Sequence, residues 1–255
     1  MKEVLMGIDI GTSGTKTILM DLNGTVLASS TVEYPVYTPK PAWSEQDPED
    51  WWNAAVETVK NVLAQVREVR VLAVSLSGQM HGMVAMDEHM QPVRRAILWN
   101  DQRTQEACDS ILETVGGLDN LLSYTNNGML TGYTAGKILW MRKEEPENYR
   151  RTKLVLNPKD YIRYRMTGEV CTEVSDASGT GLFDVEHRVF SETLLKKLDL
   201  PCDLFAPCAE STDIAGKTTI ELEKLTGLPQ GHPWRRAAEM RSSRLPGWDW
   251  LPPVS

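Results

Sequence analysis

A glycine-rich stretch near the N-terminus has the residue types to hold phosphate groups. It reads Asp9-Ile10-Gly11-Thr12-Ser13-Gly14-Thr15-Lys16 and lies between two β-rich runs. Glycine allows the close backbone approach that a phosphate needs, and the hydroxyl and amide groups supply hydrogen-bond donors. Asp9 could hold a metal-bound water, and Lys16 could offset phosphate charge. A glycine-rich hairpin turn with solvated hydroxyls explains the same residues equally well.

The spacing of this stretch excludes two common phosphate-binding motifs. It lacks the GxxxxGK[ST] pattern of a Walker A loop. It is followed by a strand-like run, whereas a dinucleotide fingerprint precedes a helix.

A second polar segment, Ser77-Gly78-Gln79-Met80-His81-Gly82, lies between two strand-like runs. The two glycines would expose Gln79, Met80 and His81 at a sheet edge, which suits recognition of a polyol by hydrogen bonds. A histidine beside a methionine is more often a structural residue. Both interpretations stay open on spacing alone.

Two further segments have acidic or amide side chains at turns. Asn100 and Asp101 follow a strand-like run, and ligands of α/β sheets usually bind at such carboxyl ends. The simpler interpretation makes Asn100 or Asp101 the N-cap of the next helix. The segment 175–180 is predicted to be a polar turn, in which Asp176 is a candidate ligand contact.

The elements that must position these residues alternate along the chain. Val4–Ile10, Thr15–Met20 and Thr25–Glu33 are predicted as antiparallel strands, with a hairpin turn at Asn23-Gly24. A helix is expected over residues 49–67, with Asp47 as N-cap and Pro48 at its first position. Further strands are expected at 70–75, 83–86, 95–99 and 153–156, and further helices at 102–115, 133–145 and 159–166. The predicted fold class is α/β, with a mixed β-sheet flanked by helices.

Composition narrows the functional classes. The 255 residues have a net charge of −8 and are 41% hydrophobic, which is typical of a globular protein with a sizeable core. An acidic chain lacks the positive field for nonspecific nucleic-acid binding, and no apolar run is long enough to span a membrane. The start of the chain has no signal-peptide pattern, so a cytoplasmic location is expected. The four cysteines have no CxxC spacing, which disfavours structural zinc or a disulfide framework.

Taken together, these segments resemble the FGGY carbohydrate kinases, and within that family the xylulokinase branch. The similarity covers roughly residues 4–233, in family order. The Asp-x-Gly-Thr loop alone would indicate only the actin-like ATPase superfamily. The other segments are typical of a smaller group of proteins and so make the resemblance more specific. The matching stretches are residues 7–16, Trp43-Ser44-Glu45-Gln46-Asp47-Pro48 through Trp52, Gly78–Gly82, Ala96–Asp101, Pro158–Tyr161 and Ser175–Gly179.

The resemblance implies a ribonuclease-H-like (actin-like ATPase) domain that forms one side of a cleft. It implies ATP and Mg²⁺ as cofactors, and phosphoryl transfer to the 5-hydroxyl of D-xylulose. Asp9 would stand near the magnesium ion, which it would contact through water, and near the transferred phosphate. The nucleotide phosphates would lie along Gly11, Thr12, Ser13, Gly14, Thr15 and Lys16. The sugar would contact Met80 and His81, with Asn100 and Asp101 in the neighbouring motif.

Two departures from the family pattern affect this expectation. The family has proline where Gly136 stands, which could loosen the start of that helix. After Pro233 the family continues with a valine-rich strand and a glycine-rich turn that holds the catalytic base. Here residues 234–255 are rich in arginine and tryptophan and show no trusted periodicity. We therefore expect a family domain at 1–233 and a non-family tail at 234–255 that a frameshift produced. We also expect the nucleotide-binding domain to be absent and this chain alone to have little activity.

Several alternatives stay open at this point. Another FGGY specificity, for gluconate, ribulose or glycerol, would use a similar domain. A non-catalytic actin-like module kept for sugar binding or assembly, or an inactive product of a damaged gene, would also fit. The expected partners are a sugar and a nucleotide, with no nucleic acid and no membrane. Exposed sheet edges could in addition promote a homodimer.

Overall fold

The N-terminal strands form an antiparallel meander in the computed structural model, which describes residues 1–231 and 233–235. Strand β1 (Lys2–Ile10) pairs with β2 (Gly14–Asp21), and β2 pairs with β3 (Val26–Glu33). Val4, Met6, Ile8 and Ile10 are buried and alternate with half-buried residues along β1. This alternation places one face of the sheet against the core. The three predicted strands are confirmed.

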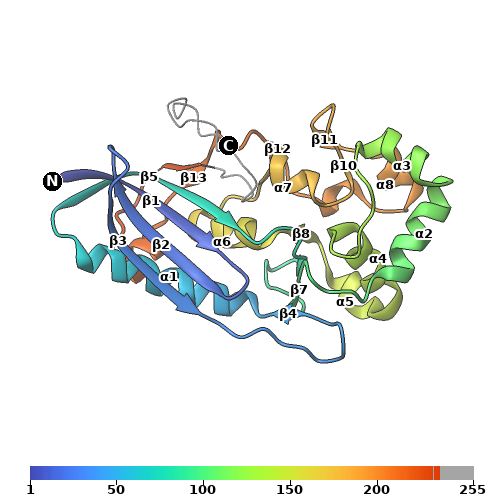
Figure 1. Cartoon of the computed structure of the whole chain (residues 1–255), viewed down its shortest axis with the longest axis horizontal. Coiled ribbons are helices and arrows are strands. Elements are labelled where there is room, and N and C mark those ends of the chain that lie inside the picture. The colour runs from blue at the N-terminus through green and yellow to red at the C-terminus, as the bar shows by residue number, and fades with distance from the viewer. Residues whose placement is uncertain (232, 236–255) are drawn as a thin grey trace, which may run out of the picture.

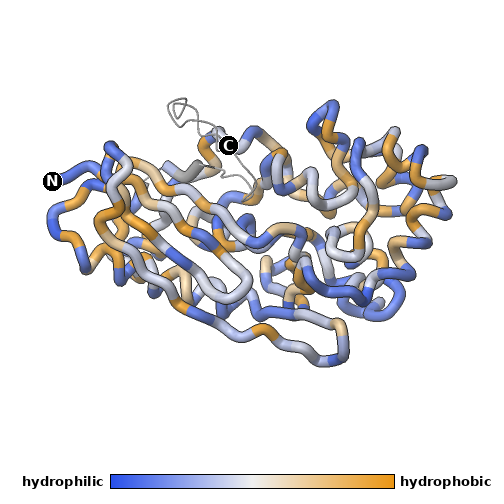
Figure 2. The backbone as a smooth tube through the Cα atoms, viewed as in Figure 1, coloured by the Kyte–Doolittle hydropathy of each residue, from blue (hydrophilic) through white to orange (hydrophobic). Residues whose placement is uncertain are grey.

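Helix α1 (Pro48–Gln65) covers that buried face (Figure 1). Asp47 is its N-cap and accepts a hydrogen bond from the backbone N–H of Glu49, and Pro48 occupies the first helical position, both as predicted. Trp51 and Val59 are fully buried in the core beneath the sheet. The chain then enters β5 (Val69–Gly78), which runs parallel to β1 on the side away from β2. Figure 2 shows hydrophobic and polar residues interspersed along these strands and α1.

The main sheet is completed by strands from the end of the described chain. Its order is β13-β14-β5-β1-β2-β3, with β13 (Ile214–Lys217) antiparallel to β14 (Pro233–Arg235) and β14 parallel to β5. The sheet is therefore mixed, and the predicted fold class is confirmed. Strand β14 crosses the boundary that the sequence suggested at residue 233. Residues 236–255, most of the expected tail, lie outside the described residues.

A second hydrophobic cluster lies among helices at the other end of the molecule (Figure 1). Helices α6 (Pro158–Thr167) and α9 (Ile220–Thr226) instead pack beside the main sheet and α1. Short strand pairs lie between and beside these elements. The helices around the second cluster are α2 (Gln105–Val115), α3 (Leu118–Thr125), α4 (Thr134–Glu144), α5 (Pro146–Arg151) and α8 (Glu192–Lys197). The strand pairs are β4 (Glu45–Gln46) with β7 (Ala96–Ile97), β6 (Val84–Met86) with β8 (Leu154–Leu156), β9 (Thr172–Glu173) with β12 (Cys208–Ala209), and β10 (Phe183–Asp184) with β11 (Val189–Phe190).

Two local predictions were wrong. Neither Asn100 nor Asp101 caps a helix: α2 begins after Thr104, and the Asp101 carboxylate is engaged by Arg103 instead. The segment 175–180 is not simply a polar turn. It contains most of the short helix α7 (Val174–Ser178), whose N-cap Glu173 accepts hydrogen bonds from two backbone N–H groups. Among the described residues, no helix is both long enough and apolar enough to cross a bilayer.

Candidate functional site

The turn between β1 and β2 presents the predicted phosphate-binding residues. The Gly11 N–H donates to the Gly14 carbonyl oxygen at 3.1 Å and closes the turn. A Cβ on Gly14 would lie 2.7 Å from the Val32 carbonyl oxygen, so this position requires glycine. Gly11 and Thr12 are half-buried, and the Ser13 side chain is exposed. The turn therefore offers backbone and hydroxyl groups at the end of the sheet.

Asp9 and Lys16 lie beside this turn on one face of the sheet. They are directly opposite each other in the β1–β2 register, and Lys16 is exposed. The Ser77 hydroxyl donates to Asp9 Oδ1 at 2.7 Å, which fixes the carboxylate at the ends of β1 and β5. At this edge the Asp9 carboxylate is suited to a magnesium ion, and the neighbouring lysine is suited to the phosphate that the ion accompanies.

Thr15 is placed differently from the other residues of the stretch. It is fully buried and shares the α1 face of β2 with Thr17, whose hydroxyl donates to Thr58 Oγ1 at 2.7 Å. Successive residues of a strand point to opposite faces, so the Thr15 side chain lies on the other side of the sheet from Asp9 and Lys16. Its neighbour Tyr34 donates to the Gly11 carbonyl oxygen at 2.5 Å. The Thr15 side chain thus belongs to the support of the turn.

The second predicted segment lies directly beside the first. The Gln79 N–H donates to the Ile10 carbonyl oxygen at 2.7 Å. The fully buried Gln46 links the two loops: its Nε2 donates to the Thr12 carbonyl oxygen at 2.7 Å, and its Oε1 accepts from Gln79 Nε2 at 2.9 Å. Trp51 Nε1 donates to the same Oε1 at 3.0 Å. The structure therefore brings the turn and the Met80-His81 loop together through one side-chain amide.

The His81 loop is held in a defined conformation. His81 has φ +60°. Its ring lies against Tyr133, with centroids 4.7 Å apart. On another side the ring contacts the backbone of Gly179, where a Cβ would lie 2.3 Å from the imidazole. The half-buried Met80 precedes it. The loop is thus supported by residues of the predicted segment 175–179.

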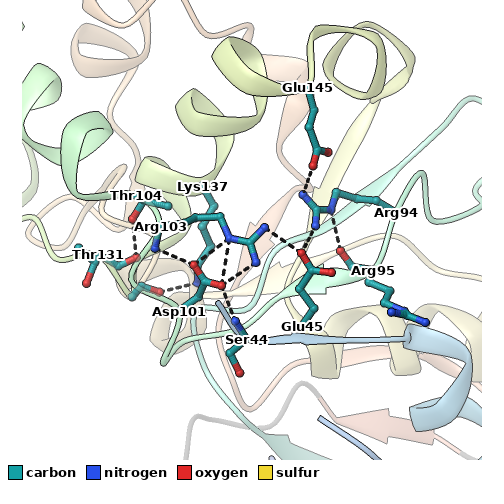
Figure 3. A network of polar contacts seen from close by, with 11 residues as sticks. Ser44, Glu45, Arg94, Arg95, Asp101, Arg103, Thr104, Thr131, Lys137 and Glu145 are labelled. Carbon is teal, nitrogen blue, oxygen red and sulfur yellow. Dashed lines mark hydrogen bonds and ion pairs between the residues drawn. The ribbon is translucent and has the colours of Figure 1, made fainter. Parts of the chain in front are cut away.

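Asn100 and Asp101 occupy different environments. Trp99 Nε1 donates to Thr12 Oγ1 at 3.0 Å, which brings this segment next to the turn between β1 and β2. Asn100 is exposed beside it. Asp101 is fully buried and accepts from the Ser44 N–H at 2.6 Å and from the Arg103 guanidinium at 2.7–3.0 Å. Figure 3 shows this carboxylate enclosed by those donors. Asn100 can face a ligand, whereas Asp101 anchors the loop.

Arg103 continues this network to the strand pair β4–β7 (Figure 3). Its Nη1 donates to Glu45 Oε1 at 2.8 Å, and its guanidinium stacks on Trp43 at 3.6 Å. Arg94 pairs with the same Glu45 oxygen, and its Nη1 donates to Glu145 Oε1 at 2.7 Å. The backbone next to Gln46 is therefore fixed by buried ion pairs.

Asp176 lies inside a separate buried cluster of charges. Lys159 Nζ lies 2.9–3.1 Å from oxygens of Asp160, Glu173 and Asp176, and Arg163 Nη1 donates to Asp160 Oδ1 at 2.8 Å. Burial raises the pKa of Asp176 to about 7. Although burial opposes it, the three carboxylates raise the pKa of Lys159 above its ordinary value. Asp176 is therefore a buried member of an ion-pair cluster.

The described residues contain no group of three or more histidine, cysteine, aspartate or glutamate side chains that could hold a metal ion. Magnesium often binds through one or two carboxylates, substrate phosphates and water. The Asp9 carboxylate, oriented by Ser77, fits that mode.

The comparison with known protein families decides the assignment. Residues 4–239 match the model of the N-terminal domain of the FGGY family of carbohydrate kinases. The chain belongs to this family. The match extends six residues past the boundary expected at residue 233.

Proteins similar to this FGGY chain include bacterial xylulose kinases. It is 41% identical over 230 residues to the xylulose kinase of Bacillus subtilis (strain 168), covering 89% of this chain and 46% of that protein. It is 41% identical over 223 residues to the xylulose kinase of Escherichia coli (strain K12), covering 88% and 46%. The crystal structure of xylulose kinase from Rhodospirillum rubrum superposes with a TM-score of 0.89 at 26% identity, over 92% of this chain and 49% of that one. The FGGY chain thus spans about half the length of these relatives.

Sequence reasoning missed several residues that support this FGGY site. Gln46 lies inside a recognised segment, but its spacing gave no sign that its amide joins two distant loops. Lys137 lies between buried apolar residues of α4. A lysine at such a position of a helix indicates a buried charge, and this signal was present in the sequence. Trp99 and Tyr133 were also not identified as neighbours of Thr12 and His81.

Proposed function

We propose that this chain is the sugar-binding half of an ATP-dependent kinase that transfers phosphate to the 5-hydroxyl of D-xylulose. The observation that carries the proposal is the connection from Thr12 through Gln46 to Gln79, because it puts a phosphate-type turn beside the Met80-His81 loop. The 41% identity to two xylulose kinases supports D-xylulose as the sugar. Since the chain spans about half of those proteins, the complete reaction is part of the proposal.

In this proposal, the phosphate side of the site is the end of the β1–β2 hairpin. The hydroxyls of Thr12 and Ser13 would donate to phosphate oxygens, and Lys16 would offset their charge. Gly11 and Gly14 would let the phosphate approach the turn closely. Asp9 would hold the water shell of Mg²⁺, which supplies neutralisation of charge on the transferring phosphoryl group when bound. Ser77 keeps the Asp9 carboxylate aimed at that position.

The sugar side is formed by the adjacent loops. Met80 and His81 would contact the ketose, and the exposed Asn100 would donate or accept hydrogen bonds with its hydroxyls. Asp101 would act on the sugar only indirectly, since its two oxygens already bind the Ser44 N–H and Arg103. The chain therefore binds and orients both substrates on one surface.

The first test is sugar binding by the 255-residue protein. We expect calorimetric titration with D-xylulose to give a dissociation constant in the millimolar range or tighter. Gluconate, ribulose and glycerol serve as the comparison panel. Tighter binding of one of these sugars would assign another FGGY specificity, and absence of binding to all of them would contradict the proposal.

Turnover by the same protein is expected to be small. The family resemblance places the base carboxylate in a glycine-rich turn with no counterpart in these 255 residues, and a positioned base contributes about 10²–10⁴-fold in rate. A coupled ATP-dependent assay with D-xylulose measures this. A rate equal to that of a full-length relative would refute the expectation that this chain lacks the base.

Replacing Gly179 by alanine tests the position of the His81 ring. Gly179 has φ −80°, so alanine adds no backbone strain, but its Cβ would lie 2.3 Å from the imidazole. The ring must move, and we expect D-xylulose affinity to fall at least about tenfold, equivalent to about 1.4 kcal/mol. Gly128→Ala is the matched control, since nothing lies within 4 Å of its Cβ. Equal affinity in both variants would show that the ring does not contact the sugar.

A further inference from the structure

Lys137 is a buried cation beneath the sugar loop. It is the fourth residue of α4, and none of its surface is exposed. Its Nζ donates to the His81 carbonyl oxygen at 2.5 Å and to the Gly132 carbonyl oxygen at 2.6 Å. An ammonium group is costly to bury, and these two carbonyl groups offset part of that cost.

The first carbonyl belongs to a residue in an unfavourable backbone conformation. A φ of +60° is uncommon for a residue with a side chain. Such a conformation persists when surrounding contacts determine it. Lys137 Nζ supplies the shorter contact to this carbonyl, and the Thr134 hydroxyl donates to it at 3.3 Å. The orientation of the His81 peptide group is therefore fixed from α4.

The second carbonyl belongs to a segment that touches the other sugar-side motif. A Cβ on Gly132 would lie 2.4 Å from the Trp99 carbonyl oxygen, so the two backbones are in close contact. Tyr133, the next residue, places its ring against His81. Lys137 thus joins the His81 loop to the chain beside Trp99 and Asn100.

Burial makes the ammonium group of Lys137 easier to deprotonate than that of a solvent-exposed lysine. Burial lowers the pKa of Lys137 to about 7, the Asp101 carboxylate opposes this, and the Arg103 guanidinium adds to it. Cys108 also faces it and favours its charged form. Figure 3 shows Lys137 behind the Asp101–Arg103 pair.

We propose that Lys137 is a positioning residue of the sugar site, which holds the His81 and Gly132 carbonyls together and so sets the place of the His81 and Tyr133 rings. It does not touch the sugar, because it is fully buried. This proposal rests on the proposed function for its effect on sugar binding. Its effect on the loop itself is independent of the sugar.

Lys137→Met tests the proposal, because methionine keeps the length of the apolar stem and removes every donor. We expect D-xylulose affinity to fall at least about tenfold and the backbone amides of residues 80–83 to exchange with deuterium faster. The control is Leu139→Ala, which removes a buried side chain of the same helix without touching the His81 carbonyl. We expect it to lower thermal stability while affinity and exchange at 80–83 stay close to those of the original protein.

A measurement on the unaltered protein covers the case in which Lys137→Met does not fold. With ¹⁵N-labelled lysine at about pH 6, below the pKa of about 7, a buried ammonium held by two carbonyls gives a slowly exchanging resonance. We expect a resonance of this kind with a scalar coupling to the His81 carbonyl carbon, which distinguishes Lys137 from the other buried lysine, Lys159. Its absence would overturn the proposal.

The outcomes separate the two proposals. If the original protein does not bind D-xylulose, the proposed function fails, and exchange at residues 80–83 together with the ammonium resonance still decides the role of Lys137. If the protein binds D-xylulose but Lys137→Met changes neither affinity nor exchange, the role of Lys137 is refuted and the proposed function stands.

Discussion

Replacing Arg103 by methionine is expected to lower the free energy of unfolding by about 3–5 kcal/mol, because it leaves a fully buried carboxylate without its cation. Arg103 and Asp101 side chains are 1% and 0% exposed, and after the substitution Asp101 would keep the backbone N–H groups of residues 44 and 103 as hydrogen-bond donors but lose its paired guanidinium. The stacking on Trp43 would be lost as well. Urea unfolding followed by fluorescence or circular dichroism measures the change.

Two further variants test the cause of this loss. Arg165→Met is the control, since Arg165 also stacks on a tryptophan and pairs with a carboxylate, but at a partly exposed site. We expect it to cost less than about 1 kcal/mol. Adding Asp101→Asn to Arg103→Met should recover part of the loss by removing the unpaired charge. No recovery would mean that lost stacking, and not the buried charge, determines the stability.

Replacing Lys159 by methionine is expected to be at least as destabilising at neutral pH. Lys159 is the cation shared by Asp160, Glu173 and Asp176, and without it Arg163, which pairs with Asp160, is the cation left in direct contact with this cluster among the described residues. Breaking a buried ion pair typically costs about 3–5 kcal/mol. Lys143→Met, which removes an exposed lysine paired with Glu106, is the control and should change stability by less than about 1 kcal/mol.

The Lys159→Met defect should depend on pH in a defined direction. Burial already raises the pKa of Asp176 to about 7, and loss of the cation raises it further. A carboxyl whose pKa is higher in the folded state than in the unfolded state stabilises the fold at low pH and loses that contribution as pH rises through the folded pKa. The deficit relative to the original protein should therefore be smaller near pH 5 than near pH 8. A deficit that is equal at both pH values would show that lost packing dominates.

The sequence predicted the elements whose signals are local. The Asn23-Gly24 turn fixes the β2–β3 hairpin, and Asp47 with Pro48 fixes the start of α1, since capping and turn formation involve only near neighbours. The mixed α/β class followed from the order of these elements. The Gln46 contacts place the two loops side by side, which no local signal in the sequence indicates.

Two residues had their surroundings predicted incorrectly because their partners lie elsewhere in the chain. In both cases a local interpretation, a helix cap or a polar turn, explained the sequence equally well. Asp101 looked like a helix cap, but its carboxylate is taken by Ser44 N–H, 57 positions away, and by Arg103. Asp176 was predicted to lie in a polar turn, but the structure pairs it with Lys159 in the interior. Strand pairs of two or three residues, such as β4 with β7, are too short to leave a periodic pattern.

The full hydrogen bonding of Gln46 has a mechanical consequence. Its amide donates to two carbonyl groups and accepts from two N–H groups, so turning the amide over would place donors against donors and acceptors against acceptors. The hairpin end and the histidine loop are therefore expected to move as one rigid body. Any shortening of the gap between a bound phosphoryl group and a sugar hydroxyl during a catalytic cycle must then come from a hinge outside this pair of loops.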